Sequence, residues 1–143
     1  MSSRYPHGAW NVKVTDVRVY PIQGRHWPRF PWLLVEVETD EGIAGLGEAL
    51  PYRSSGVYES LENIKRRLIG RDPTQIELLW EELYRDGVSL PAISGVETAL
   101  WDIPSKSLKA PIHSLLGGTC RARARPLGNR KPNGTSLYRT SLE

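Results

Sequence analysis

A hydrophobic alternation of period two recurs through residues 11–49 and predicts β-strands. It is clearest in residues 32–39, where the inward-facing set is expected to be Leu33, Val35 and Val37, and the outward-facing set Leu34, Glu36 and Glu38. The segment 11–20 is rich in β-branched residues, but its alternation changes phase between Val14 and Val17, which predicts a bulge.

The connections between these strands predict how they pair. Asp40 to Gly42 form a short turn that reverses the chain into a third strand at residues 43–49. Residues 21–31 contain three prolines and no periodicity, so they are expected to form a surface loop. Three sequential strands joined in this way predict an antiparallel meander.

From residue 56 onward the apolar positions follow the period of an α-helix. The three expected apolar stripes are Val57, Leu61, Ile64 and Leu68; Ile76, Leu79, Trp80, Leu83 and Tyr84; and Ile93, Val96, Leu100 and Ile103. Asp72 and Gln75 have capping-box spacing around Pro73, which suits a first helical turn. A short fourth helix is expected to close on Gly117 and Gly118. The predicted fold class is α+β, a three-stranded meander with a helical cluster on one face.

The length of the chain excludes a complete barrel domain, and its excess positive charge is concentrated at one end. The chain of 143 residues is too short for a (β/α)₈ barrel, which needs about 250 residues. Its 19 basic and 16 acidic residues are unevenly distributed: residues 121–143 hold six basic residues and one acid, which leaves 13 and 15 in the first 120. The body is therefore slightly acidic, and the excess positive charge lies in the tail.

No local motif in the sequence predicts catalysis. Gly45 and Gly47 resemble a dinucleotide fingerprint, but Leu50 stands where the third glycine is needed. Glu48 ends a strand beside a loop, where a polar strand end is the simpler interpretation. The histidines are scattered, and the single Cys120 can form neither an internal disulfide nor a metal cluster. With no signal-like or membrane-length apolar run, a cytoplasmic protein without a membrane partner is expected.

The order of several separated segments carries more information than any single motif. These segments are "VKVTDVRVYPI", "WLLVEVETDEGIAGLGEA", "IGRDPTQIELLWEELYR", "PAISGVETALWDI" and "PIHSLLGG". Together they resemble the N-terminal capping domain of the enolase superfamily, in its mandelate racemase and muconate lactonizing enzyme branch. Sugar-acid dehydratases, galactonate dehydratases among them, look nearest. The resemblance covers residues 11–118, which leaves 1–10 as an extension and 119–143 as a basic tail, expected to be disordered or out of frame.

The resemblance implies a two-part enzyme. In that family the capping domain closes over a barrel whose acidic side chains bind Mg²⁺ and whose Lys or His base removes the proton alpha to a carboxylate. No residue of this chain matches a metal ligand or that base, so no catalytic residue and no cofactor site are expected in it; Mg²⁺ belongs to full-length members. The chain is therefore expected to be a truncated member, inactive alone, in which a frameshift or premature stop replaced the barrel with the basic tail. A genuine arginine-rich appendage is the rival explanation of that tail.

The resemblance also implies two substrate loops, at residues 24–30 and 49–55. Their candidate binding residues are Arg25, His26, Arg29, Tyr52 and Arg53. Guanidinium groups pair well with carboxylates, and the other side chains can hydrogen-bond hydroxyl groups, so the set suits a polyhydroxy acid. Without a barrel beneath them, ordinary exposed loop residues are the favoured interpretation.

Two other functions stay open. A capping subunit acting in trans would need an exposed apolar surface for a separate barrel or for a second copy of the chain, with Trp101, Ile112, Leu115 and Leu116 as candidates. A nucleic-acid binder could use the basic tail, but the tail lacks interleaved aromatic residues, so nucleic acid ranks last. A sugar acid is a partner only if a barrel is supplied. Pro104, where the family has ordinary helix, is expected to shorten or kink the third helix.

Overall fold

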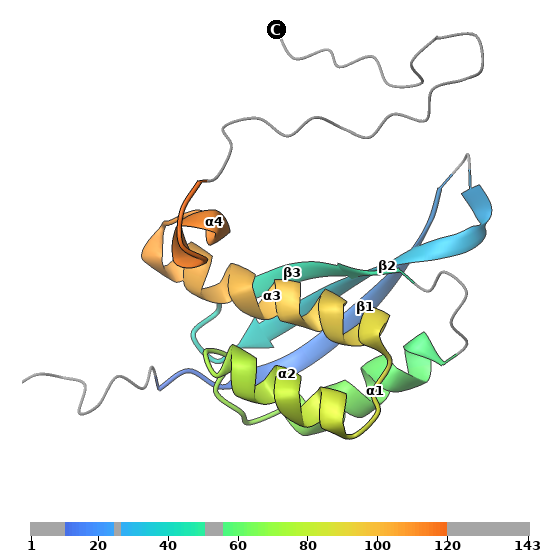
Figure 1. Cartoon of the computed structure of the whole chain (residues 1–143), viewed down its shortest axis with the longest axis horizontal. Helices are drawn as coiled ribbons and strands as arrows, with labels where there is room; N and C mark the ends of the chain where they lie inside the picture. The colour runs from blue at the N-terminus through green and yellow to red at the C-terminus, as the bar shows by residue number, and fades with distance from the viewer. Residues whose placement is uncertain (1–10, 25–26, 51–55, 120–143) are drawn as a thin grey trace, which may run out of the picture.

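The computed structural model describes residues 11–24, 27–50 and 56–119. Three strands are followed by four helices, and the helices cover one face of the sheet (Figure 1). The elements are β1 (Val14–Gly24), β2 (Trp27–Thr39), β3 (Ala44–Ala49), α1 (Val57–Leu68), α2 (Ile76–Arg85), α3 (Leu90–Leu108) and α4 (Ile112–Leu115). The sheet is antiparallel throughout, in the order β1-β2-β3. The α+β meander predicted from the sequence is confirmed.

The strands follow the predicted alternation. Leu33, Val35 and Val37 of β2 are fully buried under the helices, and the register of β1 against β2 shifts between Val14 and Asp16, which confirms the bulge. Gly42 completes the turn after β2 with a positive φ of 73°, and its N–H donates to the Thr39 carbonyl.

The expectation of a surface loop over residues 21–31 is wrong. β1 continues to Gly24 and β2 begins at Trp27, so the pair extends as a two-stranded ribbon (Figure 1). Backbone pairing needs no alternation of side chains, and β1 is an edge strand, where a proline such as Pro21 is tolerated. The ribbon ends on the pair Gly24 and Trp27.

The core lies between the inner face of the sheet and the helices. The stripes predicted for α1 and α3 are buried in full. In α2, Ile76, Leu79 and Leu83 are buried, whereas Tyr84 is 55% exposed and stacks on Trp80 with a centroid separation of 5.0 Å. The prediction that Tyr84 is a buried residue is therefore wrong. No helix in the described part of the chain is long and apolar enough to span a membrane.

The start of α2 also differs from the prediction. The helix begins at Ile76, three residues later than a cap at Asp72 would place it. The Asp72 carboxylate instead accepts hydrogen bonds from the Thr74 N–H at 2.9 Å and from the Thr74 hydroxyl at 2.7 Å. Because Asp72 closes this local turn, it does not act as the helix cap.

Pro104 does not end α3, so the expectation of a shortened helix is wrong. The helix continues four residues beyond Pro104, to Leu108. Ile103, immediately before the proline, is fully buried, and Asp102 and Lys106 bond to β3. These tertiary contacts on both sides of Pro104 outweigh the backbone hydrogen bond that proline cannot make.

The backbones of α3 and β3 approach each other very closely. A Cβ atom placed on Gly45 or Gly47 would lie less than 3.0 Å from backbone atoms of α3, and one on Gly95 would lie less than 3.0 Å from Ala49. Steric exclusion of a Cβ atom therefore explains why glycine occupies all three positions. The helix backbone rests directly on the strand, with no side chain between them.

Gly47→Ala tests this contact. The added methyl group meets the carbonyl of Gly95, which is backbone and cannot rotate away, so we expect the free energy of unfolding to fall by about 3 kcal/mol. Urea denaturation followed by circular dichroism measures the change. Glu48→Ala, at the exposed neighbouring position, is the control and should change stability by less than about 0.5 kcal/mol. Equal stability of the Gly47→Ala variant and the parent would contradict the close contact.

Candidate functional site

The described residues that border the two implied substrate loops lie toward one end of the sheet. β1 and β3 run in the same direction, so their last residues, Gly24 and Ala49, lie toward the same end of the domain (Figure 1). Gly24 and Trp27 border residues 25–26, and Leu50 and Gly56 border residues 51–55. The topology thus brings the borders of both loops to the ribbon end of the sheet.

The candidate binding residues themselves lie outside what the structure describes. This holds for Arg25, His26, Tyr52 and Arg53, and for the side chain of Arg29, whose backbone belongs to β2. Their roles stay predictions. Arg29 was expected in a loop, and its strand backbone corrects that part of the expectation.

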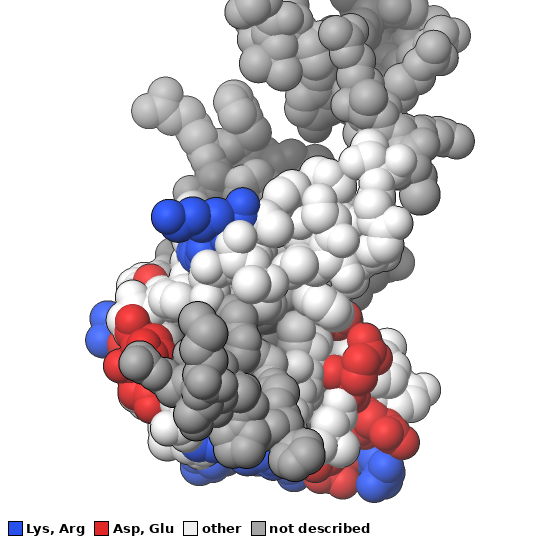
Figure 2. Space-filling model, turned by 90° about the vertical axis from the view of Figure 1, so that its left-hand side faces the viewer, with Lys and Arg blue, Asp and Glu red and all other residues white. Residues whose placement is uncertain are grey.

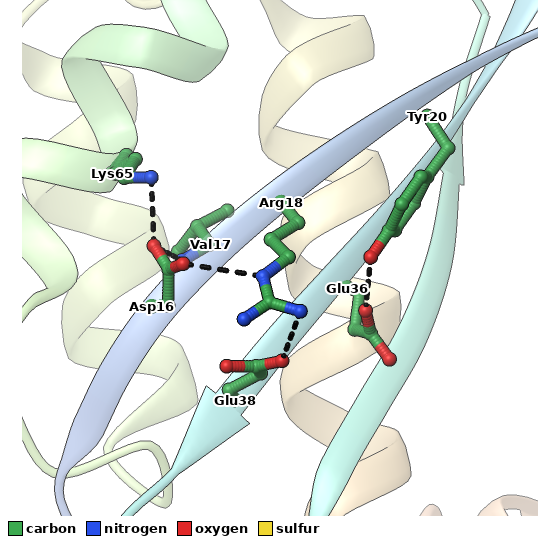
Figure 3. A network of polar contacts seen from close by, with 7 residues as sticks. All are labelled: Asp16, Val17, Arg18, Tyr20, Glu36, Glu38 and Lys65. Carbon is green, nitrogen blue, oxygen red and sulfur yellow. Dashed lines mark hydrogen bonds and ion pairs between the residues drawn. The ribbon is translucent and has the colours of Figure 1, made fainter.

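Polar side chains form a network along β1 and β2 (Figure 3). The Lys65 ammonium of α1 lies 2.7 Å from the Asp16 carboxylate, and the Arg18 guanidinium lies 3.3 Å from Asp16 and 3.0 Å from Glu38. Asp16 also accepts a hydrogen bond from the Val17 N–H at 2.8 Å. The network therefore fastens β1 to both β2 and α1.

The contact between Asp16 and Lys65 shifts the pKa of both side chains. The hydrogen bond from Lys65 lowers the pKa of Asp16 below its usual 3.8, against a smaller opposing effect of desolvation. The same contact raises the pKa of Lys65 above 10.5. Both groups are thus held in their charged forms near neutral pH, which is the behaviour of a structural ion pair, so neither Asp16 nor Lys65 is poised to exchange a proton.

The described residues do not fit a magnesium site. In residues 11–24, 27–50 and 56–119, no three His, Cys, Asp or Glu side chains come together as a metal would require. Asp16 and Glu38 approach each other only through Arg18, whose positive charge would repel a cation. No buried polar side-chain atom in these residues lacks a hydrogen-bond partner.

Apolar side chains are exposed at the end of the domain around α4, beside the exposed Lys109 that follows Leu108. Leu108 and Leu116 are 56% and 60% exposed, and Ile112 and Leu115 of α4 are partly exposed. Figure 2 views this end of the molecule and shows uncharged atoms across its middle and right, with a cluster of Lys or Arg atoms at the upper left. Trp101 is half-buried and packs against the core, so it adds less to this surface than expected.

Two polar residues of α3 have a role that the sequence did not reveal. Asp102 accepts a hydrogen bond from the backbone N–H of Leu46 at 2.9 Å, and Lys106 donates to the carbonyl of Ala44 at 2.6 Å. The only available signal was their i, i+4 spacing, which predicts an ion pair on the helix but not its contact with a strand.

Comparison with known proteins agrees with this fold. The family model "Mandelate racemase / muconate lactonizing enzyme, N-terminal domain" matches residues 12–117. The D-galactonate dehydratase of Verminephrobacter eiseniae is 37% identical over 124 residues, covering 82% of this chain and 31% of the relative. That of Ralstonia nicotianae is 37% identical over 121 residues, covering 80% and 30%. The chain thus spans about a third of the length of these curated relatives.

A solved structure extends the agreement to three dimensions. The mandelate racemase/muconate lactonizing enzyme from a Sulfitobacter species superimposes with a TM-score of 0.67 at 31% identity, covering 77% of this chain and 31% of that protein. The strands, the helices and the ordered segments all lead to the same conclusion: this chain belongs to the family of mandelate racemase and muconate lactonizing enzyme N-terminal domains, in the enolase superfamily.

Proposed function

We propose that residues 11–118 are the substrate-capping domain of an acid-sugar dehydratase of the D-galactonate dehydratase kind. The observation that carries the proposal is the identity of 37% to D-galactonate dehydratases over more than 120 residues, which covers at least 80% of this chain. The dehydratase reaction, its dependence on Mg²⁺ and a cytoplasmic location are parts of this proposal.

The chemistry of the described residues supports a capping role and no catalytic one. Their polar network is held charged by internal pairing, and they supply no magnesium ligand set. Metal binding and proton abstraction would therefore come from the part of the relatives that this chain does not match. We accordingly expect the chain to be inactive until a barrel is supplied, in the same polypeptide or by a separate one.

The surface around α4 supports contact with such a barrel. Exposed leucines at positions 108 and 116 flank the partly exposed Ile112, and residues 110–119 contain no Asp, Glu, Lys or Arg, although the exposed Lys109 lies next to Leu108. Burying these apolar side chains against a partner would remove them from water, provided that the Lys109 ammonium keeps contact with water or with an acidic group. The same surface would contact a barrel domain in the same polypeptide or a separate barrel that binds in trans.

A chimera tests the proposal. Residues 1–118 replace the matching N-terminal domain of the Verminephrobacter eiseniae enzyme, joined to its own remaining residues. We expect the chimera to dehydrate D-galactonate in the presence of Mg²⁺, and the 143-residue chain alone to have no activity. Formation of the 2-keto product measures the reaction. A folded chimera without activity toward any acid sugar, beside an active parent, would count against the proposal.

The trans-acting form has its own measurement. When the 143-residue chain is mixed with the barrel portion of the same relative, activity should appear in proportion to the complex formed. Leu116→Glu, which puts a charge on the apolar surface, should weaken that complex at least tenfold, because a buried unpaired carboxylate is costly. Glu81→Ala, on the exposed side of α2, is the control. Equal binding by both variants would exclude this surface as the contact.

The predicted substrate residues can be tested in the chimera. Arg53→Ala should raise KM for D-galactonate by about tenfold or more, because a charge-assisted hydrogen bond to a carboxylate contributes roughly 1.5–3 kcal/mol. Arg85→Ala removes the same charge from α2, where Arg85 pairs with Glu81, and should leave KM unchanged. Steady-state kinetics separate the two outcomes. An unchanged KM for Arg53→Ala would favour the interpretation of an ordinary exposed loop residue.

Asp16→Asn separates stability from activity. The pKa of Asp16 is lower in the folded chain than its usual 3.8, so the carboxylate stabilises the fold above that value and ceases to do so as the pH falls through the lowered pKa. The variant should therefore be less stable than the parent at pH 7, and the difference should vanish in acid. Thermal unfolding between pH 2 and pH 7 measures it. A difference that persists at the lowest pH would contradict the ion-pair origin, and loss of activity in a folded chimera would contradict the structural role.

A further inference from the structure

A three-stranded sheet has two edges, and each edge strand carries backbone N–H and C=O groups that can pair with another chain. In this protein the edge strands are β1 and β3. β3 is short and carries the exposed apolar Leu46, so an open edge there would offer both hydrogen bonds and apolar contact to an incoming strand. The groups bonded to this edge therefore matter for how the domain behaves in solution.

The edge of β3 is occupied by two side chains from α3. The Leu46 N–H, a donor, meets the Asp102 carboxylate at 2.9 Å, and the Ala44 carbonyl, an acceptor, meets the Lys106 ammonium at 2.6 Å. These two outward backbone groups thus receive partners of the complementary kind. Asp102 and Lys106 are also bonded to each other at 2.6 Å, which fixes both side chains.

The similar spacing of residues along a strand and along a helix explains why two side chains of α3 can bond two backbone groups at the edge of β3. Residues two apart on a strand are separated by about 6.8 Å, and residues four apart on a helix by about 6 Å along its axis. α3 runs antiparallel to β3, as the contacts of Gly45 with Ala99 and of Gly47 with Gly95 require. Positions 44 and 46 of the strand therefore face positions 106 and 102 of the helix.

The opposite edge is protected by different means. Val14 exchanges hydrogen bonds with the connection between α1 and α2, through Gly70 and Arg71 at 2.8 and 2.9 Å. The Val17 N–H is bonded to Asp16, and Pro21 has no N–H to offer. Within the described residues both edges of the sheet thus have some of their backbone groups satisfied or removed.

We propose that the Asp102–Lys106 pair acts as an edge guard, which takes the place of a fourth strand beside β3 and prevents this edge from pairing with another chain. The pair does so in two ways. It satisfies the Leu46 N–H and the Ala44 carbonyl, and it forces an incoming strand to displace and desolvate two charged groups. Removal of the pair exposes a short strand edge beside an apolar side chain, and the kind of partner that fits is a second copy of β3.

The double variant Asp102→Ala/Lys106→Ala in the full 143-residue chain tests the guard. Amide hydrogen exchange measured by NMR should be about tenfold or more faster at Leu46 than in the parent, because the charge-assisted hydrogen bond is lost. Sedimentation velocity should show association that increases with protein concentration and exceeds that of the parent. Glu81→Ala/Arg85→Ala removes an i, i+4 pair of the same type from α2 and should match the parent in both measurements.

The outcomes are distinct. Faster exchange at Leu46 together with added association supports the guard. Faster exchange without added association overturns it, because the contact then only stabilises the strand, and unchanged exchange at Leu46 overturns the contact itself. If circular dichroism shows that the double variant is unfolded, Lys106→Met provides the second test. This variant keeps the Asp102 bond to Leu46 and frees the Ala44 carbonyl, so it too should associate more than the parent.

Discussion

The direct contact between the backbones of α3 and β3 is the constraint on which the rest of the fold depends. It exists because Gly45, Gly47 and Gly95 carry no side chain at the points where helix and strand meet. With α3 fixed at this distance, its buried stripe covers β2 and its flank receives α1 and α2. The same proximity brings Asp102 and Lys106 within reach of the edge of β3. One steric condition thus sets the core, the helix layer and the state of a sheet edge.

Features of the fold that neighbouring residues determine could be predicted from the sequence, whereas features that tertiary contacts determine could not. The alternation in β2 and the stripes of α1 and α3 come from burial on one face, which is written directly in the order of the residues. The start of α2 was not predictable, because the side chain of Asp72 could close either a turn or a helix, and only the folded chain shows that it bonds Thr74. The helix likewise passes through Pro104 because of tertiary contacts that no local rule contains.

The candidate site was less accessible than the fold. The ordered segments pointed correctly to the family, because a family resemblance uses the whole chain at once. The polar network was missed because Asp16, Glu38 and Lys65 are far apart in sequence, and each alone looks like a solvated residue on a strand or a helix. Their meeting requires the bulge near Asp16 and the packing of α1 against β1. Gly45 and Gly47 had a correct structural interpretation, but their partner on α3 could not be named from spacing alone.

The unequal lengths of the strands have a consequence for how this domain can change over evolution. β3 pairs with β2 only as far as Leu33, whereas β1 and β2 continue together to Gly24 and Trp27. A two-stranded ribbon contributes little stability of its own, so its tip can be lengthened, shortened or rebuilt without disturbing the glycine contacts beneath α3. The domain thus keeps the part that could be selected for new ligands apart from the part that must stay fixed for the chain to fold.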